Sequence, residues 1–121
     1  MYLKQNQGKI NYEQRKSIIK MLLKGLCELE KHGILHRDLK PENIMITKDG
    51  KNLKIVDFGL ATETKIDKYI FVRCGTPGYV APEILRIRDD EKPVLDCISD
   101  MFSLGSIFYQ MLFERRLFNA I

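Results

Sequence analysis

The eight residues from His36 to Asn43, HRDLKPEN, constrain this chain more than any other stretch of its sequence. Five of these eight side chains are charged or ionisable, and Pro41 lies among them. Such a stretch is a poor candidate for a helix interior or a buried strand, because proline lacks an N–H donor and charged groups resist burial. It is instead typical of a rigid loop, where proteins often place reactive side chains. The rest of the chain must hold this loop in position.

The side chains of this loop suit phosphoryl transfer. Asp38 can accept a hydroxyl proton, Lys40 can reach a transferred phosphoryl group, and the Asn43 carbonyl oxygen can bind a hard cation. A second carboxylate, Asp57, follows the apolar run 53–56, which predicts a short buried strand ending at this aspartate. Asn43 and Asp57 together would therefore offer two oxygen ligands to one magnesium–phosphate site.

Four motifs, in order and at matching spacing, resemble eukaryotic-type protein kinases. Residues 36–43 resemble the catalytic loop of that family, and 57–59, DFG, resemble its metal-binding tripeptide. Residues 81–83, APE, resemble the motif that closes the activation segment, and 100–105 resemble the start of the large central helix. We identify the chain by this resemblance as part of a serine/threonine protein kinase catalytic domain.

The resemblance implies an α+β, protein-kinase-like fold. Residues 1–121 would form a mostly helical fragment of the large lobe with a small β-hairpin, and the small lobe would be missing. The activation segment would cover 57–83, and the central helix about 99–112. Two short apolar runs, 44–46 and 53–56, predict a hairpin across the turn 48–51.

The implied site uses ATP and Mg²⁺ as cofactors and a protein Ser/Thr hydroxyl as acceptor. The expected catalytic residues are Asp38, Lys40, Asn43 and Thr76, and the expected metal ligands are Asn43 and Asp57. Thr76 resembles the family threonine that hydrogen-bonds the catalytic aspartate and lysine. The cofactor-binding set is Lys40, Glu42, Asn43, Met45 and Asp57. Met45 would lie beneath the adenine ring, with ordinary core packing as the equal alternative.

Two parts of the sequence bear on which acceptor residue and which flanking residues a substrate would have. Residues 40–43, KPEN, resemble serine/threonine rather than tyrosine kinases. The run 75–83 resembles the calmodulin-dependent kinase group, whose members often prefer basic residues before the acceptor, and Glu42 could meet an arginine there. Gln110 occupies a place where some of these relatives carry an acid. The resemblance therefore leaves the preference open.

Regulation by the activation segment depends on Arg37. Arg37 resembles the arginine that pairs with a phosphorylated activation loop in many relatives. A threonine often sits two residues before the Cys-Gly-Thr run, where this chain has Val72. The remaining acceptors are Thr62, Thr64 and Tyr69. Either loop phosphorylation or some other acid would therefore hold Arg37.

Supporting residues are also expected from sequence. Asn11, with Gln14 three places on, predicts a capped helix whose apolar stripe includes Ile18 and Leu22 and ends near Gly33. The resemblance further implies that His36 and Phe58 pack together. It implies that Asp100 hydrogen-bonds the backbone of the catalytic loop.

The composition of the chain limits the classes of binding partner and the cellular locations that we expect. The net charge is +4, but 20 basic residues are scattered among 16 acidic ones, so we expect no nucleic acid. The three cysteines are widely spaced and without metal-site spacing, which favours free thiols and a cytoplasmic location. We see no signal peptide and no apolar run of membrane-spanning length, so we expect no membrane.

Three hypotheses remain for the function. The first is a serine/threonine kinase present as a fragment, with a regulatory protein as a further candidate partner. The second is a truncated, non-catalytic binding or scaffold module, and the third is a nonfunctional remnant. The sequence contains no GxGxxG, and we find neither the strand lysine nor the helix glutamate that kinases also need. We therefore expect little activity from these 121 residues by themselves.

Overall fold

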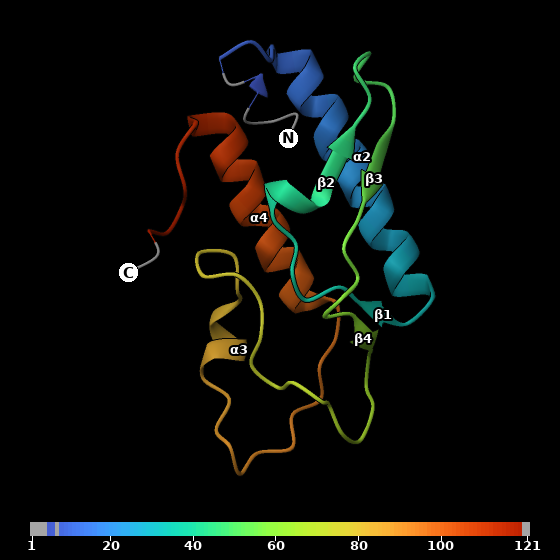
Figure 1. Ribbon diagram of the computed structural model, residues 1–121, viewed down its shortest axis with the longest axis vertical. Helices are drawn as coiled ribbons and strands as arrows, with labels where there is room; N and C mark the ends of the chain where they lie inside the picture. The colour runs from blue at the N-terminus through green and yellow to red at the C-terminus, as the bar shows by residue number, and fades with distance from the viewer. Residues whose placement is uncertain (1–4, 7, 120–121) are drawn as a thin grey trace.

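Two long helices organise the computed structural model, which describes residues 5–6 and 8–119 (Figure 1). The ends of the predicted 1–121 domain therefore lie outside the described residues. In chain order the elements are α2 (Tyr12–Lys31), β1 (Ile34–Leu35), η1 (Pro41–Asn43), β2 (Ile44–Ile46), β3 (Leu53–Ile55), β4 (Thr62–Glu63), α3 (Pro82–Leu85) and α4 (Ile98–Phe113). The expected α+β class is thus confirmed, with more of the described residues in helices than in strands, although irregular segments outnumber both.

Helix α2 begins at the predicted cap. The Asn11 side chain accepts a hydrogen bond from the Gln14 N–H at 2.9 Å, and the Gln14 side chain accepts one from the Asn11 N–H at 2.9 Å. This reciprocal pair satisfies two N–H groups that the first helical turn would otherwise leave without partners. The helix ends at Lys31, two residues before Gly33, which has a positive φ of 63°.

Two antiparallel pairs of short strands lie beside the helices. The predicted hairpin is present as β2 and β3, with Ile44 opposite Ile55. Its second strand ends at Ile55, one residue earlier than predicted. A second pair, β1 with β4, was not predicted, because two-residue strands carry no readable alternation. This second pair joins the segment before the catalytic loop to the segment after Asp57.

Helix α4 spans Ile98–Phe113, one residue longer at each end than predicted. Glu114 ends it in the left-handed conformation, with φ 55°. The buried face of α4 contributes Leu104 and Ile107 to a core shared with α2 and the hairpin. A smaller core lies under the activation segment and includes Tyr69, Ile84 and Leu95.

The catalytic loop runs between these two cores. Leu35, just before it, is buried in the smaller core, and Leu39, within it, is buried in the larger one. Burying a leucine contributes roughly 2 kcal/mol. Two such anchors only four residues apart therefore fix the path of the polar residues between them.

The described cysteines are all free thiols, as expected: Cys27, Cys74 and Cys97. Among the described residues, no helix combines the length and hydropathy that crossing a membrane requires.

Candidate active site

A buried carboxylate at the start of α4 fixes the backbone of the catalytic loop. Asp100 accepts hydrogen bonds from the N–H groups of His36 at 2.8 Å and Arg37 at 3.1 Å, and it is 1% exposed. Burial raises the pKa of Asp100, an effect that the two backbone N–H donors oppose without cancelling. The expected role of Asp100 is therefore confirmed by geometry.

His36 connects the loop to the strand that delivers Asp57. Its ring is fully buried, with Nε2 2.9 Å from the Val56 carbonyl oxygen and Nδ1 3.1 Å from the Asp38 N–H. The carbonyl can only accept, so Nε2 carries the proton and Nδ1 accepts from Asp38. The ring also meets Phe58 edge-on, at 4.9 Å between centroids. The expected packing of His36 against Phe58 is confirmed.

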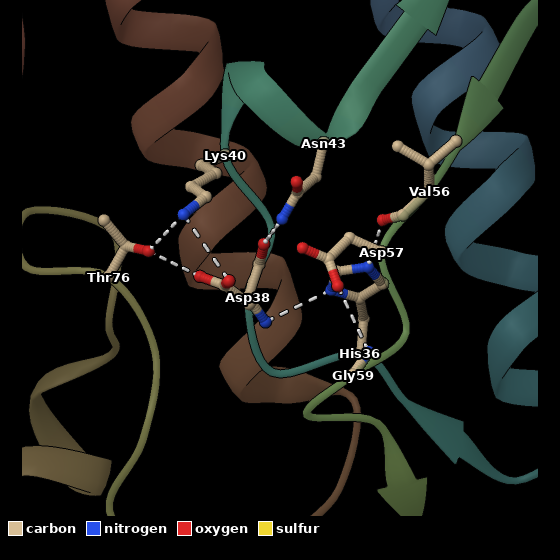
Figure 2. Close-up of polar contacts among 8 residues, drawn as sticks. All are labelled: His36, Asp38, Lys40, Asn43, Val56, Asp57, Gly59 and Thr76. Carbon is tan, nitrogen blue, oxygen red and sulfur yellow. Dashed lines mark hydrogen bonds and ion pairs between the residues drawn. The ribbon is translucent and has the colours of Figure 1, made fainter.

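Asp38, Lys40 and Thr76 form a closed triangle (Figure 2). The Thr76 hydroxyl donates to Asp38 Oδ1 at 2.6 Å and accepts from Lys40 Nζ at 2.8 Å. Lys40 Nζ also lies 3.5 Å from Asp38 Oδ2. The side chains of Asp38 and Lys40 are 13% and 23% exposed, so solvent screens this pair only partly. The loop and the activation segment thus build one site.

Gly75 allows Thr76 to come this close to the loop. Its φ is +124°, and a Cβ added there would lie 2.9 Å from the Arg37 carbonyl oxygen and 2.7 Å from Val80. Any other residue would force the two segments apart, because a backbone oxygen cannot swing away as a flexible side chain can. The glycine before Thr76 is therefore required by the contact itself.

Asn43 and Asp57 lie on the other side of Asp38 (Figure 2). Asn43 Nδ2 donates to the Asp38 carbonyl oxygen at 2.8 Å, which leaves the amide oxygen as a candidate ligand. Asp57 has a positive φ of 62°, and one of its carboxylate oxygens accepts from the Gly59 N–H at 3.3 Å. Strained backbone of this kind is concentrated at functional sites.

This pair fits magnesium in its donor chemistry. Mg²⁺ usually takes one or two protein oxygens and completes its shell with water and phosphate oxygens. Among the described residues, no three His, Cys, Asp or Glu side chains gather as a metal site. Any cation here would therefore depend on the Asn43 amide, the Asp57 carboxylate and oxygens from outside the chain.

Arg37 contacts two backbone carbonyl groups of the activation segment. Its Nε donates to the Leu60 carbonyl oxygen at 2.7 Å, and its Nη1 donates to the Phe71 carbonyl oxygen. Its φ is +71°, a conformation that costs a non-glycine residue roughly 1 kcal/mol. Backbone carbonyls hold the guanidinium, and no acid among the described residues is seen to pair with it; pairing of Arg37 with a phosphorylated activation loop stays a prediction.

Tyr69 was a candidate phosphorylation site, and the structure contradicts this. Its ring is 5% exposed, and its hydroxyl accepts from the Leu95 N–H at 3.2 Å and from the Ile66 N–H at 3.3 Å. A phosphate cannot be added to this oxygen without breaking those contacts. Thr62 and Thr64, which are partly exposed, remain candidates.

Met45 and Glu42, the other two residues predicted to bind the cofactor, lie in different surroundings. Met45 is 56% exposed, so the alternative that it packs in the core is wrong for this structure. Its apolar side chain is free to meet a ligand. Glu42 is only partly exposed and lies near enough to Tyr79 for its charge to raise the pKa of that phenol.

Sequence reasoning missed the contact between Tyr79 and Gln110. The Tyr79 hydroxyl donates to the Gln110 side-chain oxygen, and the Tyr79 carbonyl oxygen accepts from Ser103 at 2.7 Å. The first pair is separated by 31 residues, so no local pattern could have indicated it. These bonds attach the end of the activation segment to α4.

Comparison with known proteins matches the chain to one family and to several protein kinases. Residues 1–121 match the family described as "Protein kinase domain". The chain is 38% identical to sperm motility kinase 2B of Mus musculus over 95% of its length, and 38% identical to serine/threonine-protein kinase PLK4 of Danio rerio over 98%. It is 43% identical to serine/threonine-protein kinase cds1 of Schizosaccharomyces pombe over 87%.

A solved structure gives the same result for the fold. The crystal structure of the yeast RNA Pol II CTD kinase CTDK-1 complex contains a chain that matches 98% of this one with a TM-score of 0.84 and 32% identity. This chain spans 38% of that chain, and 23%, 12% and 23% of the three curated relatives. None of these names identifies the calmodulin-dependent group, so that finer resemblance stays a prediction.

Proposed function

Because this chain belongs to the protein kinase domain family, we propose that it supplies the catalytic loop and activation segment of an ATP-dependent serine/threonine protein kinase. The observation that carries the proposal is the triangle of Asp38, Lys40 and Thr76. It places a carboxylate and an ammonium group side by side, with both held by one hydroxyl. The KPEN sequence and the names of the relatives favour Ser/Thr acceptors.

Asp38 is the proposed base. The acceptor oxygen forms a bond to the γ-phosphorus of ATP while the bond from that phosphorus to the β–γ bridging oxygen breaks, and the acceptor proton passes to the Asp38 carboxylate. Thr76 occupies Asp38 Oδ1, so Oδ2 is the oxygen that remains to receive the proton. Lys40, 3.5 Å from Oδ2, stabilises negative charge on the transferred group.

Asn43 and Asp57 are the proposed magnesium ligands, and Met45 the proposed contact for the adenine. Magnesium, when bound, would neutralise charge on the phosphate oxygens. The bond from Asn43 to the Asp38 carbonyl oxygen orients the amide so that its oxygen faces away from the loop backbone. The Gly59 N–H restrains the Asp57 carboxylate in the same way.

The proposed partners are proteins, and the proposed location is the cytoplasm. The acceptor would be a protein, and a regulatory protein is a further candidate partner, since the similar yeast kinase is described as part of a complex. The free thiols of Cys27, Cys74 and Cys97 support a reducing compartment such as the cytoplasm. Such an enzyme would act in signal transduction.

The test is phosphate transfer by the full-length polypeptide that carries this chain. With Mg-ATP, serine and threonine peptides should be labelled and matched tyrosine peptides should not. Asp38→Asn should lower kcat by roughly 10²- to 10³-fold, the cost of removing one preorganised catalytic group. Glu63→Gln, at an exposed position in β4, is the matched control and should leave kcat unchanged.

Two results would contradict the proposal. One is wild-type protein that folds and transfers no phosphate to any peptide, which would favour the non-catalytic binding module. The other is an Asp38→Asn variant with wild-type kcat.

A further inference from the structure

A pocket of about 200 Å³ lies apart from the catalytic triangle, between the start of α2, the end of α4 and Pro41. Its charged lining, among the described residues, consists of Arg15, Arg115, Arg116 and Glu114. Three guanidinium groups therefore face one carboxylate. The surplus of positive charge is local, because the chain as a whole carries only +4 over 121 residues.

The three arginines are held by contacts that leave donors available. Arg116 lies 5.7 Å above the ring of Tyr79 and also hydrogen-bonds the Tyr79 side chain, and Arg115 lies 5.9 Å above the ring of Tyr109. A guanidinium that meets an aromatic face keeps N–H donors at its edge for an anion. Arg15 Nη2 is 3.9 Å from Glu114 Oε1, a long contact that binds the guanidinium only weakly.

The α4 side of the pocket is neutral where it meets the activation segment. Gln110 lines the pocket, and its side-chain oxygen accepts from the Tyr79 hydroxyl. Burial raises the pKa of Tyr79, with Glu42 adding to this effect and Arg116 opposing it. The phenol therefore stays protonated and donating at neutral pH, and the Gln110 oxygen is committed to it. Glu114 is the acid in the lining that competes for the arginines.

Pro41 connects the pocket to the reaction. It lines the pocket and directly follows Lys40, whose Nζ belongs to the catalytic triangle. A peptide with its acceptor hydroxyl at Asp38 can thus present a neighbouring side chain to the pocket.

We propose that this pocket binds an anionic side chain of the protein substrate, a carboxylate or a phosphate, and so selects acidic or already phosphorylated sequences. The proposal rests on the proposed kinase function and names its substrate class. It differs from the expectation of basic residues near the acceptor that the group resemblance suggested. A lysine or arginine of the substrate would meet three like charges and one carboxylate here, whereas an anion would meet three donors and one like charge.

The experiment measures binding and transfer separately, in the full-length polypeptide that carries this chain. Serine peptides are prepared in which one flanking position at a time is glutamate, phosphoserine, lysine or alanine. Fluorescence anisotropy without nucleotide gives each Kd, and initial rates with Mg-ATP give kcat/KM. At one or more positions glutamate or phosphoserine should bind about five- to tenfold tighter than lysine, the range for a partly exposed charge-assisted pair.

Four variants assign this preference to the pocket. Arg116→Gln and Arg115→Gln should each reduce it. Gln110→Glu keeps an oxygen acceptor for Tyr79 and should shift the preference toward lysine. Arg86→Gln, at an exposed arginine that does not line the pocket, should leave it unchanged. Tight binding of phosphoserine alone would identify a phosphate as the ligand, and equal binding of glutamate would identify a carboxylate.

The results separate this proposal from the proposed function. Tighter binding of lysine peptides, or a preference that Arg115→Gln and Arg116→Gln both leave intact, would overturn the anion pocket. Anion-selective binding without any phosphate transfer would support the pocket and refute the kinase activity. Phosphate transfer with no charge preference would support the kinase activity and overturn the anion pocket.

Discussion

The catalytic loop and the activation segment contribute to one site but are held in place differently. In the loop, residues 36–43, Leu39 is 1% exposed and the backbone is fixed by the buried Asp100. In the segment, residues 57–83, Ile70 is 90% exposed and Phe71 is 56% exposed. Local opening is cheapest where few apolar contacts are buried. The loop is therefore part of the core, whereas the segment combines exposed stretches with a few buried side chains, namely Tyr69, Tyr79 and Ala81.

Thr76 is the attachment point that matters for chemistry. It belongs to the weakly packed segment, yet it holds both Asp38 and Lys40 of the strongly packed loop. A shift of the segment would leave the loop in place and remove the group that fixes its two reactive side chains. The difference between the two regions would thus provide a physical basis for control of the proposed kinase activity.

The largest difference is expected from a matched pair of truncations. Leu39→Ala, in the loop, should lower the free energy of unfolding by about 3 kcal/mol, because it leaves a cavity in the larger core. Ile70→Ala, in the segment, should change it by less than about 0.5 kcal/mol. Urea denaturation followed by circular dichroism measures both. Equal losses would contradict the comparison.

Asp100→Asn should lower the free energy of unfolding by about 2 kcal/mol. The amide supplies one acceptor oxygen where two backbone N–H groups now find two, so a buried donor loses its partner. Asp67→Asn, at an exposed aspartate of the segment, is the control and should have no measurable effect. A loss below about 0.5 kcal/mol would show that Asp100 does not fix the loop.

Tyr69→Phe should cost about 1 kcal/mol, the value of a typical hydrogen-bonding group. The change removes the oxygen that accepts from Leu95 and Ile66 but keeps the buried ring. Hydrogen exchange of those two amide groups should accelerate, while exchange in the catalytic loop should not. Unchanged exchange at both amides would mean that Tyr69 does not anchor the segment.

The burial of Asp100 should also affect how the free energy of unfolding depends on pH. This is the smallest of the predicted effects. Burial raises the pKa of Asp100 above the model-compound value of 3.8, so the folded state holds this proton more tightly than the unfolded state. The Asp100 contribution to stability is therefore full below the unfolded pKa and falls as pH rises through the folded pKa. The stability of the wild type relative to Asp100→Asn should decrease over that interval in urea titrations. An increase would contradict the assigned direction.

Much of the fold and of the reactive centre could be predicted from sequence. The Asn11–Gln14 cap and the β2–β3 hairpin have local signals, namely a residue spacing and a turn between two short apolar runs. The contacts of Thr76 with Asp38 and Lys40 followed from the family resemblance. Such features depend on few residues, and each has a recognisable pattern.

The partners of Arg37 and the burial of Tyr69 could not be predicted in this way. Arg37 binds carbonyl groups 23 and 34 residues away, and any residue type supplies a carbonyl, so no sequence signal exists. Tyr69 has a polar hydroxyl and an apolar ring, so its sequence context does not say whether the side chain is exposed or buried. Its burial depends on packing with Leu95, which lies 26 residues away. Tertiary contacts between distant segments decided both outcomes.

The most direct test of this account is a double-mutant cycle on Lys40 and Thr76, read as the single-turnover rate of phosphate transfer by the full-length polypeptide. If the triangle acts as a unit, Lys40→Met and Thr76→Ala will couple by more than about 1 kcal/mol, while Lys40→Met with the control Thr47→Ala, at the β2–β3 turn, will be additive. Additivity of the Lys40 and Thr76 changes within about 0.5 kcal/mol would contradict the claim that the activation segment holds the catalytic loop through Thr76.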